Sequence, residues 1–168
     1  MPRKGDAKMN ENEKIREELL NTVTGLSDEQ LNAHPEEGRW SIVQVLDHLY
    51  LMERAITKSI ADKLQSDERI PAGDKPIELT LNREVKVQAP PYVIPSESFQ
   101  TLNEVKDKLS DSRKAFLHLV DHAKENDLEQ KSFPHPLFKE LSLKQWIPFV
   151  GLHEKRHLKQ IEELKSKL

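Results

Sequence analysis

Two histidines near the end of the sequence have the spacing of metal ligands. His153 and His157 lie four residues apart, so a helix would place both imidazole rings on one face, one turn from each other. The other residues of that helical stripe are apolar: Trp146, Val150, Ile161 and Leu164. A buried imidazole without a partner costs on the order of a few kcal/mol. We therefore predict that the pair shares a metal ion. The alternative is a pair of core histidines hydrogen-bonded to carboxylates or water.

A second histidine pair with the same spacing provides a comparison within the chain. His118 and His122 are also four residues apart. Their helical stripe is charged, with Asp111, Lys114, Asp121 and Glu125. A charged stripe is typical of the solvated face of an amphipathic helix. We therefore predict that His118 and His122 lie on the surface and bind no metal.

His48 is the candidate third ligand. It lies beside Val45 and Met52, at the edge of the apolar stripe of another predicted helix. If that helix runs antiparallel to the one carrying His153 and His157, all three rings lie at a similar depth. Taken alone, His48 would be interpreted as a hydrogen-bonded core histidine. Three neutral imidazoles suit Zn²⁺ or Ni²⁺ and leave coordination positions open for water or substrate.

The charged residues next to these histidines are weaker candidates. Asp47 and Glu154 each adjoin a predicted ligand, and could act as a general base or support a ligand. Adjacent helical positions point about 100° apart, so we expect both to face solvent or a neighbouring helix. Lys155 and Arg156 are expected to be surface charges. Two aromatic residues could line a pocket, but core packing is the preferred interpretation: Tyr50 and Trp146.

The remaining histidines lie beside prolines. His34 precedes Pro35, and His135 stands between Pro134 and Pro136. We expect both to be loop residues. The alternative is that either one lies near the mouth of the metal site.

Composition excludes several other classes of site. The 168 residues contain no cysteine, which rules out disulfides, thiolate metal sites and a cysteine nucleophile. The net charge of -3 gives no basic footprint for nucleic acid. The polar first residues lack a secretory h-region, and no apolar run is long enough to span a membrane. We expect a cytoplasmic protein that binds neither nucleic acid nor membrane.

Four long segments show helical periodicity. They cover residues 11–24, 42–65, 97–125 and 143–167. Capping boxes at Ser41 with Gln44, and at Ser142 with Gln145, mark two of the starts, and Ser96 is a candidate cap for a third. A short extra turn of helix is predicted after Ser27. Residues 66–95 hold five prolines and two short alternating runs, which favour a small hairpin or an extended strap.

The lengths of the connections predict the order of the helices. A 24-residue helix is roughly 36 Å long, and about a dozen extended residues span that distance. The 30-residue link can therefore return to the starting end and leave the second and third helices parallel. The prediction is an all-α four-helix bundle, up-down-down-up, with a long crossover between helices two and three. We expect residues 1–168 to form a single domain, with residues 1–9 as a flexible tail.

Two segments resemble motifs of a known family. Gly-Arg-Trp-Ser at residues 38–41, followed by Val-Leu-Asp-His-Leu at residues 45–49, resembles the opening motif of the DinB/YfiT-like superfamily. Residues 133–161, FPHPLFKELSLKQWIPFVGLHEKRHLKQI, are similar to its closing motif. The motifs occur in the expected order, and the resemblance covers nearly the whole chain. One departure is Lys139, where relatives often carry glycine, and it leaves the shape of that loop open.

The resemblance implies a four-helix bundle that binds one divalent metal ion through three histidines. By motif these correspond to His48, His153 and His157. Some members are S-transferases that join a low-molecular-weight thiol, such as bacillithiol, mycothiol or glutathione, to an electrophile. Related members act as isomerases, and many are described as metal-dependent hydrolases.

The resemblance therefore implies a metal-dependent enzyme acting on a small molecule, with Zn or Ni as the ion. A thiol transferase would use the metal to stabilise a thiolate, and a hydrolase would use it to activate water. The alternative is a non-catalytic metal-binding protein with a structural or stress-response role. Helical faces could also pair two copies as a homodimer.

Overall fold

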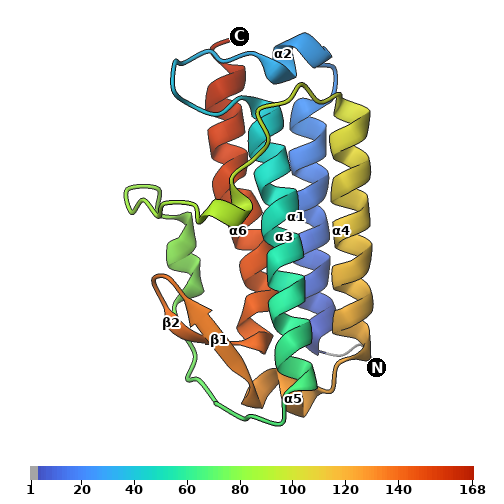
Figure 1. The fold of residues 1–168 in the computed structure, drawn as a ribbon, viewed down its shortest axis with the longest axis vertical. Coiled ribbons are helices and arrows are strands. Elements are labelled where there is room, and N and C mark those ends of the chain that lie inside the picture. The colour runs from blue at the N-terminus through green and yellow to red at the C-terminus, as the bar shows by residue number, and fades with distance from the viewer. Residues whose placement is uncertain (1–3) are drawn as a thin grey trace.

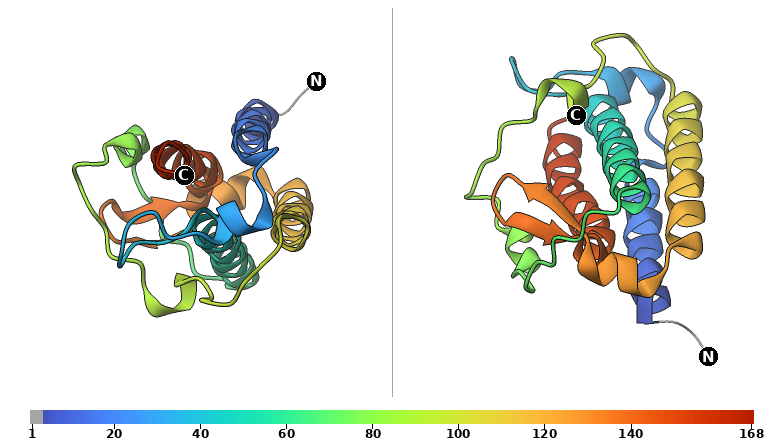
Figure 2. Two further views of the ribbon diagram at one scale, coloured as in Figure 1. Left: turned by 90° about the horizontal axis from the view of Figure 1, so that it is seen from above. Right: turned by 60° about the horizontal axis from the view of Figure 1, so that its bottom comes forward.

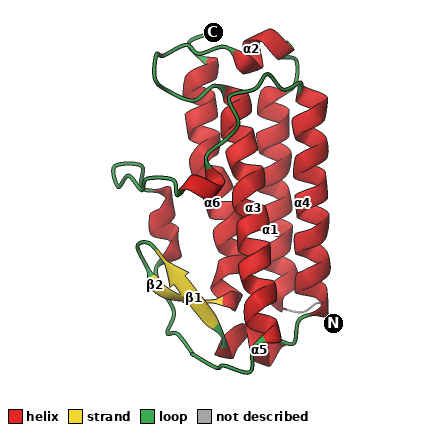
Figure 3. Cartoon of the chain, in the orientation of Figure 1, coloured by secondary structure: helices red, strands yellow, loops and turns green. Residues whose placement is uncertain are grey.

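Four long helices form the body of the molecule (Figure 1). The computed structural model describes residues 4–168. The first long helix rises, the next two descend, and the last rises again, as predicted. Cartoon colouring shows how little of the chain is strand (Figure 3). The bounds of the long helices are α1 Lys4–Val23, α3 Ile42–Gln65, α4 Leu102–His122 and α6 Leu143–Lys165.

Shorter elements connect the long helices. These are α2 Asp28–Asn32, the 3-10 helices η1 Ile77–Leu81 and η2 Pro91–Val93, α5 Glu125–Gln130, and strands β1 Ser132–His135 and β2 Lys139–Ser142. The two strands form an antiparallel hairpin in which Ser132 faces Ser142 and His135 faces Lys139. No helix within residues 4–168 combines the length and apolarity needed to cross a membrane.

Side-chain caps fix most helix starts where the sequence predicts them. Ser41 and Gln44 form a reciprocal capping box at the start of α3, and the box at Ser27 opens α2. At α6 only half of the predicted box forms: Ser142 accepts from the Gln145 amide, but the Gln145 side chain bonds to the Lys75 backbone. The start of α4 also differs from the prediction. Thr101, not Ser96, caps this helix, and Phe99, which falls within the range predicted to be helical, lies outside the helix and is 60% exposed.

The first helix begins earlier than expected. Residues 4–9, which the sequence analysis assigned to a flexible tail, form the first turns of α1, while residues 1–3 lie outside the described part of the chain. Met9 accounts for the difference, because its side chain is buried in the core and receives a contact from the Asn12 amide. Burial of this apolar side chain stabilises turns that their polar composition alone would not.

Residues 66–95 form an extended strap and not a hairpin. The strap runs outside the bundle on the side of α3 and α6, away from α1 and α4 (Figure 2). Its two 3-10 turns contact α6 and α3 respectively. Prolines at residues 90, 91 and 95 supply no backbone N–H for a strand ladder. The hairpin of this molecule is the β1–β2 pair, which the sequence analysis did not predict.

The turn of the hairpin requires an unusual backbone conformation at position 139. Three residues connect β1 to β2, and Lys139 follows them with φ of 57°. Three-residue hairpin loops need a left-handed residue at this point, which glycine supplies at least cost. Lys139 therefore adopts the left-handed conformation at a cost in conformational energy that glycine would avoid.

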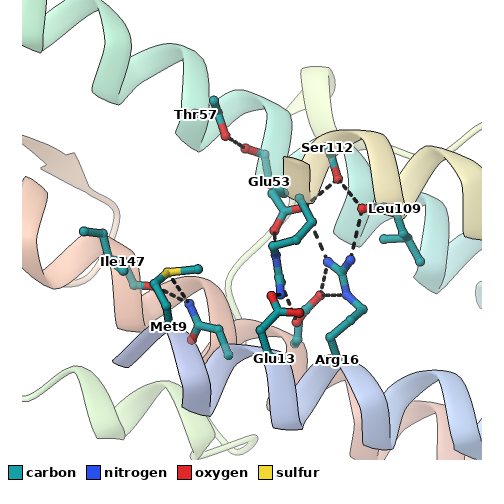
Figure 4. A network of polar contacts seen from close by, with 11 residues as sticks. Met9, Glu13, Arg16, Glu53, Thr57, Leu109, Ser112 and Ile147 are labelled. Carbon is teal, nitrogen blue, oxygen red and sulfur yellow. Dashed lines mark hydrogen bonds and ion pairs between the residues drawn. The ribbon is translucent and has the colours of Figure 1, made fainter. Parts of the chain in front are cut away.

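A layer of buried charges crosses the centre of the bundle (Figure 4). Arg16 of α1 contacts Glu53 of α3 and Glu154 of α6. Arg113 of α4 contacts the same two carboxylates, at 2.8 and 3.2 Å, and reaches Glu13 at 2.7 Å. Each of the four long helices therefore contributes at least one charge to this network. Apolar clusters pack above and below it.

Candidate metal centre

Three histidine rings from two antiparallel helices converge at one point. His48 lies on α3, and His153 and His157 lie one turn apart on α6. The Nε2 atom of His153 is 3.4 Å from that of His48 and 3.2 Å from that of His157. Within the described residues, these three form the one group of histidine or acidic side chains whose donor atoms could hold an ion, all within 4.8 Å of one another.

Hydrogen bonds at the far side of two rings fix which nitrogen faces the centre. His48 Nδ1 lies 2.7 Å from the carbonyl oxygen of Val93 in η2, and His157 Nδ1 lies 2.8 Å from Gln160 Oε1. Both oxygens can only accept, so both Nδ1 atoms must carry the proton. The Nε2 lone pairs of His48 and His157 are thereby directed to the common point, which is the arrangement that metal-ligating histidines use.

All three rings are held in the neutral form. Burial lowers the pKa of His48 below its ordinary value of 6.5. Burial, together with the nearby His157 and His48, holds the pKa of His153 well below that value. Burial beside His48 lowers the pKa of His157 to about 3. A neutral imidazole is the form that binds a metal ion, so the rings are in the ligand state at neutral pH.

The spacing of the donor atoms fits a first-row divalent ion. Zn–N bonds of about 2.0–2.1 Å in a tetrahedral arrangement separate two nitrogens by roughly 3.3 Å. Two of the three Nε2 separations, 3.2 and 3.4 Å, match that edge, and all three donor atoms lie within 4.8 Å of one another. His48 and His157 both present lone pairs to the centre, and a single proton on His153 Nε2 could satisfy only one of them, whereas a metal ion could satisfy all three nitrogens.

The three histidines open onto a cavity of about 990 Å³. Its walls come from α3, the strap, the tip of the β1–β2 hairpin and α6. Phe149, one turn before His153, stacks against that ring at 5.8 Å, and Trp40 packs against His48 at 4.9 Å. The volume is that of a small-molecule site, and the ring nitrogens lie on its wall.

The other four histidines differ in whether they are exposed or line the cavity. His118 and His122 are exposed on α4, as the charged stripe predicts. His34 is exposed too and does not line the cavity, although its Nδ1 lies 2.9 Å from the carbonyl oxygen of Arg39, a lining residue. His135 differs from the preferred loop interpretation, since it is only 8% exposed and lines the cavity.

Neither carboxylate next to a candidate ligand faces the cavity. Glu154 turns into the buried charge network. Asp47 is 2% exposed and accepts hydrogen bonds from the Ser96 amide and Lys108 Nζ. Both thus face neighbouring segments, as their offset on the helix predicts, and neither is placed to act as a general base. Trp146 packs in the core and also lines the cavity.

Arg156 lies in a different environment from the one predicted. It was expected to be a surface charge, but its guanidinium donates to the carbonyl oxygens of Thr80, Asn82 and Val85, at 2.7 to 2.9 Å. It therefore fastens the strap to α6 beside the histidines. Lys155, by contrast, is exposed as predicted. A single helix cannot reveal this role, because the partners are backbone groups some 70 residues away.

Comparison with known proteins points to one family. Residues 11–161 match the sequence model of the DinB superfamily. The uncharacterized protein YuaE of Bacillus subtilis (strain 168) is 37% identical over 153 residues, covering 91% of this chain and 94% of that protein.

Two solved structures share the fold. One is TT2238, a four-helix bundle protein, with a TM-score of 0.65, 23% identity, and coverage of 95% of this chain and 98% of that one. The other is YfiT from Bacillus subtilis, with a TM-score of 0.67, 18% identity, and coverage of 99% and 91%. YfiT is described as a probable metal-dependent hydrolase with an unusual four-helix bundle topology. At these identities the likeness establishes the fold alone.

Proposed function

The chain belongs to the DinB superfamily, and on that premise we propose that it is an enzyme dependent on one divalent metal ion. His48, His153 and His157 would hold the ion, with Zn or Ni as the metal. The observation that carries the proposal is the convergence of three neutral imidazole nitrogens on the wall of a cavity. The description of YfiT as a probable metal-dependent hydrolase is consistent with it.

The open side of the histidine cluster favours a working site over a structural one. Structural metal sites are closed by four protein ligands, whereas catalytic sites keep a position for water or substrate. No acidic side chain and no fourth histidine of the described residues joins the cluster. A bound ion would supply Lewis acidity, lowering the pKa of a water or a thiol that enters from the cavity.

The residues of the chain supply orientation and enclosure. The Val93 carbonyl and Gln160 fix the tautomers of two ligands, as described above. Trp40 and Phe149 pack against the rings and limit the access of bulk water. Arg156 holds the strap that forms the outer wall.

Two reactions suit such a site. In the first, a low-molecular-weight thiol is transferred to an electrophile. Because the chain contains no cysteine, the thiol would come from the cosubstrate. In the second, an activated water hydrolyses an ester or an amide. The alternative to an enzyme is a non-catalytic metal-binding protein with a structural or stress-response role.

Elemental analysis of the purified protein tests the metal site. We expect close to one equivalent of a divalent ion in the natural chain and a large loss in His48→Ala, His153→Ala and His157→Ala. His118→Ala is the matched control, because that histidine is exposed on the same fold and its loss should leave the metal content unchanged. Full metal content after the loss of His153 would contradict the proposal.

Turnover then separates the enzyme from the binding protein. Metal-loaded protein is assayed for conjugation of monochlorobimane to bacillithiol or glutathione, and for hydrolysis of p-nitrophenyl acetate. An enzyme should lose its rate in the His48→Ala variant and keep it in the His118→Ala variant. If the loaded protein and His48→Ala give equal rates in both assays, the non-catalytic alternative is favoured.

A further inference from the structure

His135 presents an unused hydrogen-bond donor to the cavity. Its Nδ1 accepts from the backbone amides of Leu137 and Phe138, at 3.0 and 3.2 Å. A ring nitrogen that accepts two N–H groups carries no proton, so the proton of this imidazole resides on Nε2. The Nε2–H has no partner among the described residues, although the residue is only 8% exposed and borders the cavity.

The ring is held rigidly enough to define a direction. Pro134 and Pro136 flank it in the chain. Phe149 meets the ring edge-on at 4.8 Å, and Trp146 and Phe138 pack at 5.4 and 4.7 Å. Burial also lowers the pKa of His135 to about 4, so the imidazole stays neutral and keeps a single donor. The Nε2–H is therefore free to donate to a molecule that enters the cavity.

The charge of the cavity wall indicates what kind of acceptor that molecule carries. Acidic residues outnumber basic ones in the chain, 29 to 26. The described residues that line the cavity nevertheless include no aspartate and no glutamate. They do include six basic residues: Arg39, Arg54, Lys58, Arg83, Lys86 and Arg156.

Half of that positive charge has no acidic partner. Arg39, Lys58 and Arg83 form ion pairs with acids outside the lining. Arg54, Lys86 and Arg156 form no ion pair with a carboxylate in the described part of the chain, and Arg156 bonds only to carbonyl oxygens. The wall thus offers uncompensated positive charge and a free N–H donor, a combination that favours an anion.

We propose that the cavity binds an organic carboxylate whose oxygen accepts the Nε2–H of His135. The apolar part of this ligand lies against the aromatic side of the cavity, where Phe133 stacks on Trp146 at 4.2 Å and Phe149 adjoins. The unpaired bases attract the anion. The proposal rests on the proposed function for the reaction at the metal ligands, but the hydrogen bond itself does not require an ion.

Two probes of the same shape separate charge from hydrogen bonding. Phenylacetate and phenylacetamide both carry an acceptor oxygen beside an aromatic ring, and only the first is an anion. Titration of the metal-loaded protein should give tighter binding of phenylacetate. Equal affinities for the two probes, or no binding of phenylacetate, would overturn the assignment of a carboxylate ligand.

Two replacements separate the two nitrogens of His135. The His135→Asn variant places an acceptor near Nδ1, where it can hold the loop amides, and removes the donor at Nε2. The His135→Gln variant returns an amide donor near the Nε2 position. Hydrogen bonds to a charged group are among the stronger ones, so we expect phenylacetate to bind about tenfold more weakly to His135→Asn, with partial recovery in His135→Gln.

The tautomer gives a measurement that needs neither activity nor a folded variant. Long-range nitrogen–proton correlation spectra of the natural chain should show His135 with the proton on Nε2, and that proton should shift when phenylacetate is added. A proton on Nδ1, or unchanged affinity in a folded His135→Asn, would overturn the proposal.

The metal content distinguishes this failure from failure of the proposed function. If elemental analysis finds no metal but phenylacetate binding still depends on His135, the metalloenzyme proposal fails and the carboxylate site stands. If the metal is present and His135→Asn binds phenylacetate as tightly as the natural chain, only the carboxylate site fails.

Discussion

At the scale of single residues, the environment of each imidazole decides what it can do. His153 and His157 have the same spacing as His118 and His122, but only the first pair faces a third histidine. Burial keeps the rings that line the cavity neutral, and their hydrogen bonds determine which ring nitrogen carries the proton. Two of the candidate ligands present lone pairs to the centre because their Nδ1–H groups are engaged, while His135 presents an N–H because its Nδ1 accepts.

The lowered pKa values predict how the metal-free protein responds to acid. His135 and His157 titrate near pH 4 and 3 in the folded chain, but near 6.5 when unfolded. The unfolded state therefore binds more protons as the pH falls below about 6.5, and folding stability is lost over the range from 6.5 downward. We expect the free energy of unfolding to drop by roughly 1–2 kcal/mol for His135 alone between pH 7 and pH 4, after allowance for solvent screening.

Urea unfolding of the protein, after a chelator has removed any metal, measures the free energy of unfolding across that pH range. His135→Asn removes one titrating group, so its stability should depend less steeply on pH than that of the natural chain. His34→Asn, which changes an exposed histidine, is the matched control. Parallel pH profiles for the natural chain and His135→Asn would show that His135 is not held neutral.

At the scale of elements, the position of α6 depends on a close contact with α1. Gly151 lies against Asn12, and a Cβ at residue 151 would come 2.1 Å from Asn12 Oδ1 and 3.3 Å from Ile15 Cδ1. The Asn12 side chain is buried, and its amide donates to the Ile147 carbonyl at 2.9 Å. It therefore cannot move aside without loss of that hydrogen bond. Gly151 lies two residues before His153, so this contact also sets the depth of two candidate ligands.

Replacement of Gly151 by alanine is expected to destabilise the protein. In an exposed helix the same change would stabilise by up to about 1 kcal/mol, but overpacking here should cost about 1–3 kcal/mol. Thermal or urea unfolding of Gly151→Ala measures the balance. The double variant with Asn12→Ala should recover part of the loss from overpacking. Increased stability in Gly151→Ala alone would contradict the close contact.

At the scale of the whole molecule, the buried charge network ties the four long helices together around the site. Glu53 accepts hydrogen bonds from Ser112 Oγ at 2.5 Å and from Arg113 Nε at 2.8 Å. Arg113 also donates to Glu154, the residue next to His153. Burial raises the pKa of Glu154, against the opposing effect of Arg16 and Arg113. Such a network fixes which helices meet and at what depth, which apolar packing alone specifies less strictly.

Removal of one partner should cost far more than removal of a matched pair. Arg113→Met removes the shorter of the two buried ion pairs of Glu53, which is 2.8 Å long, and breaking a buried pair costs about 3–5 kcal/mol. The double variant Glu53→Met with Arg113→Met leaves Arg16 and Glu154 paired, so it should lose less stability than Arg113→Met alone.

Urea unfolding compares these variants with Lys58→Met, which breaks an exposed pair with Asp62 and should change stability by less than about 1 kcal/mol. A double variant whose loss equals the sum of the two single losses would show that the two charges act independently.

The sequence by itself determined the elements that follow from local periodicity and caps. It predicted the four helices, their up-down-down-up order, and the helix face that carries His153 and His157, because these depend on side-chain spacing and on connection lengths. It missed the hairpin, the helical residues 4–9 and the start of α4, where packing of Met9 and capping by Thr101 outweigh local propensity.

Only the tertiary structure decided how the side chains are used. The tautomer of His48, the contacts that Arg156 makes with the strap and the charges around Glu154 all depend on groups distant in sequence, several of them backbone carbonyls. A backbone group leaves no sign in the residue types, because every residue carries one. Which of them meets a given side chain is fixed only when the helices pack.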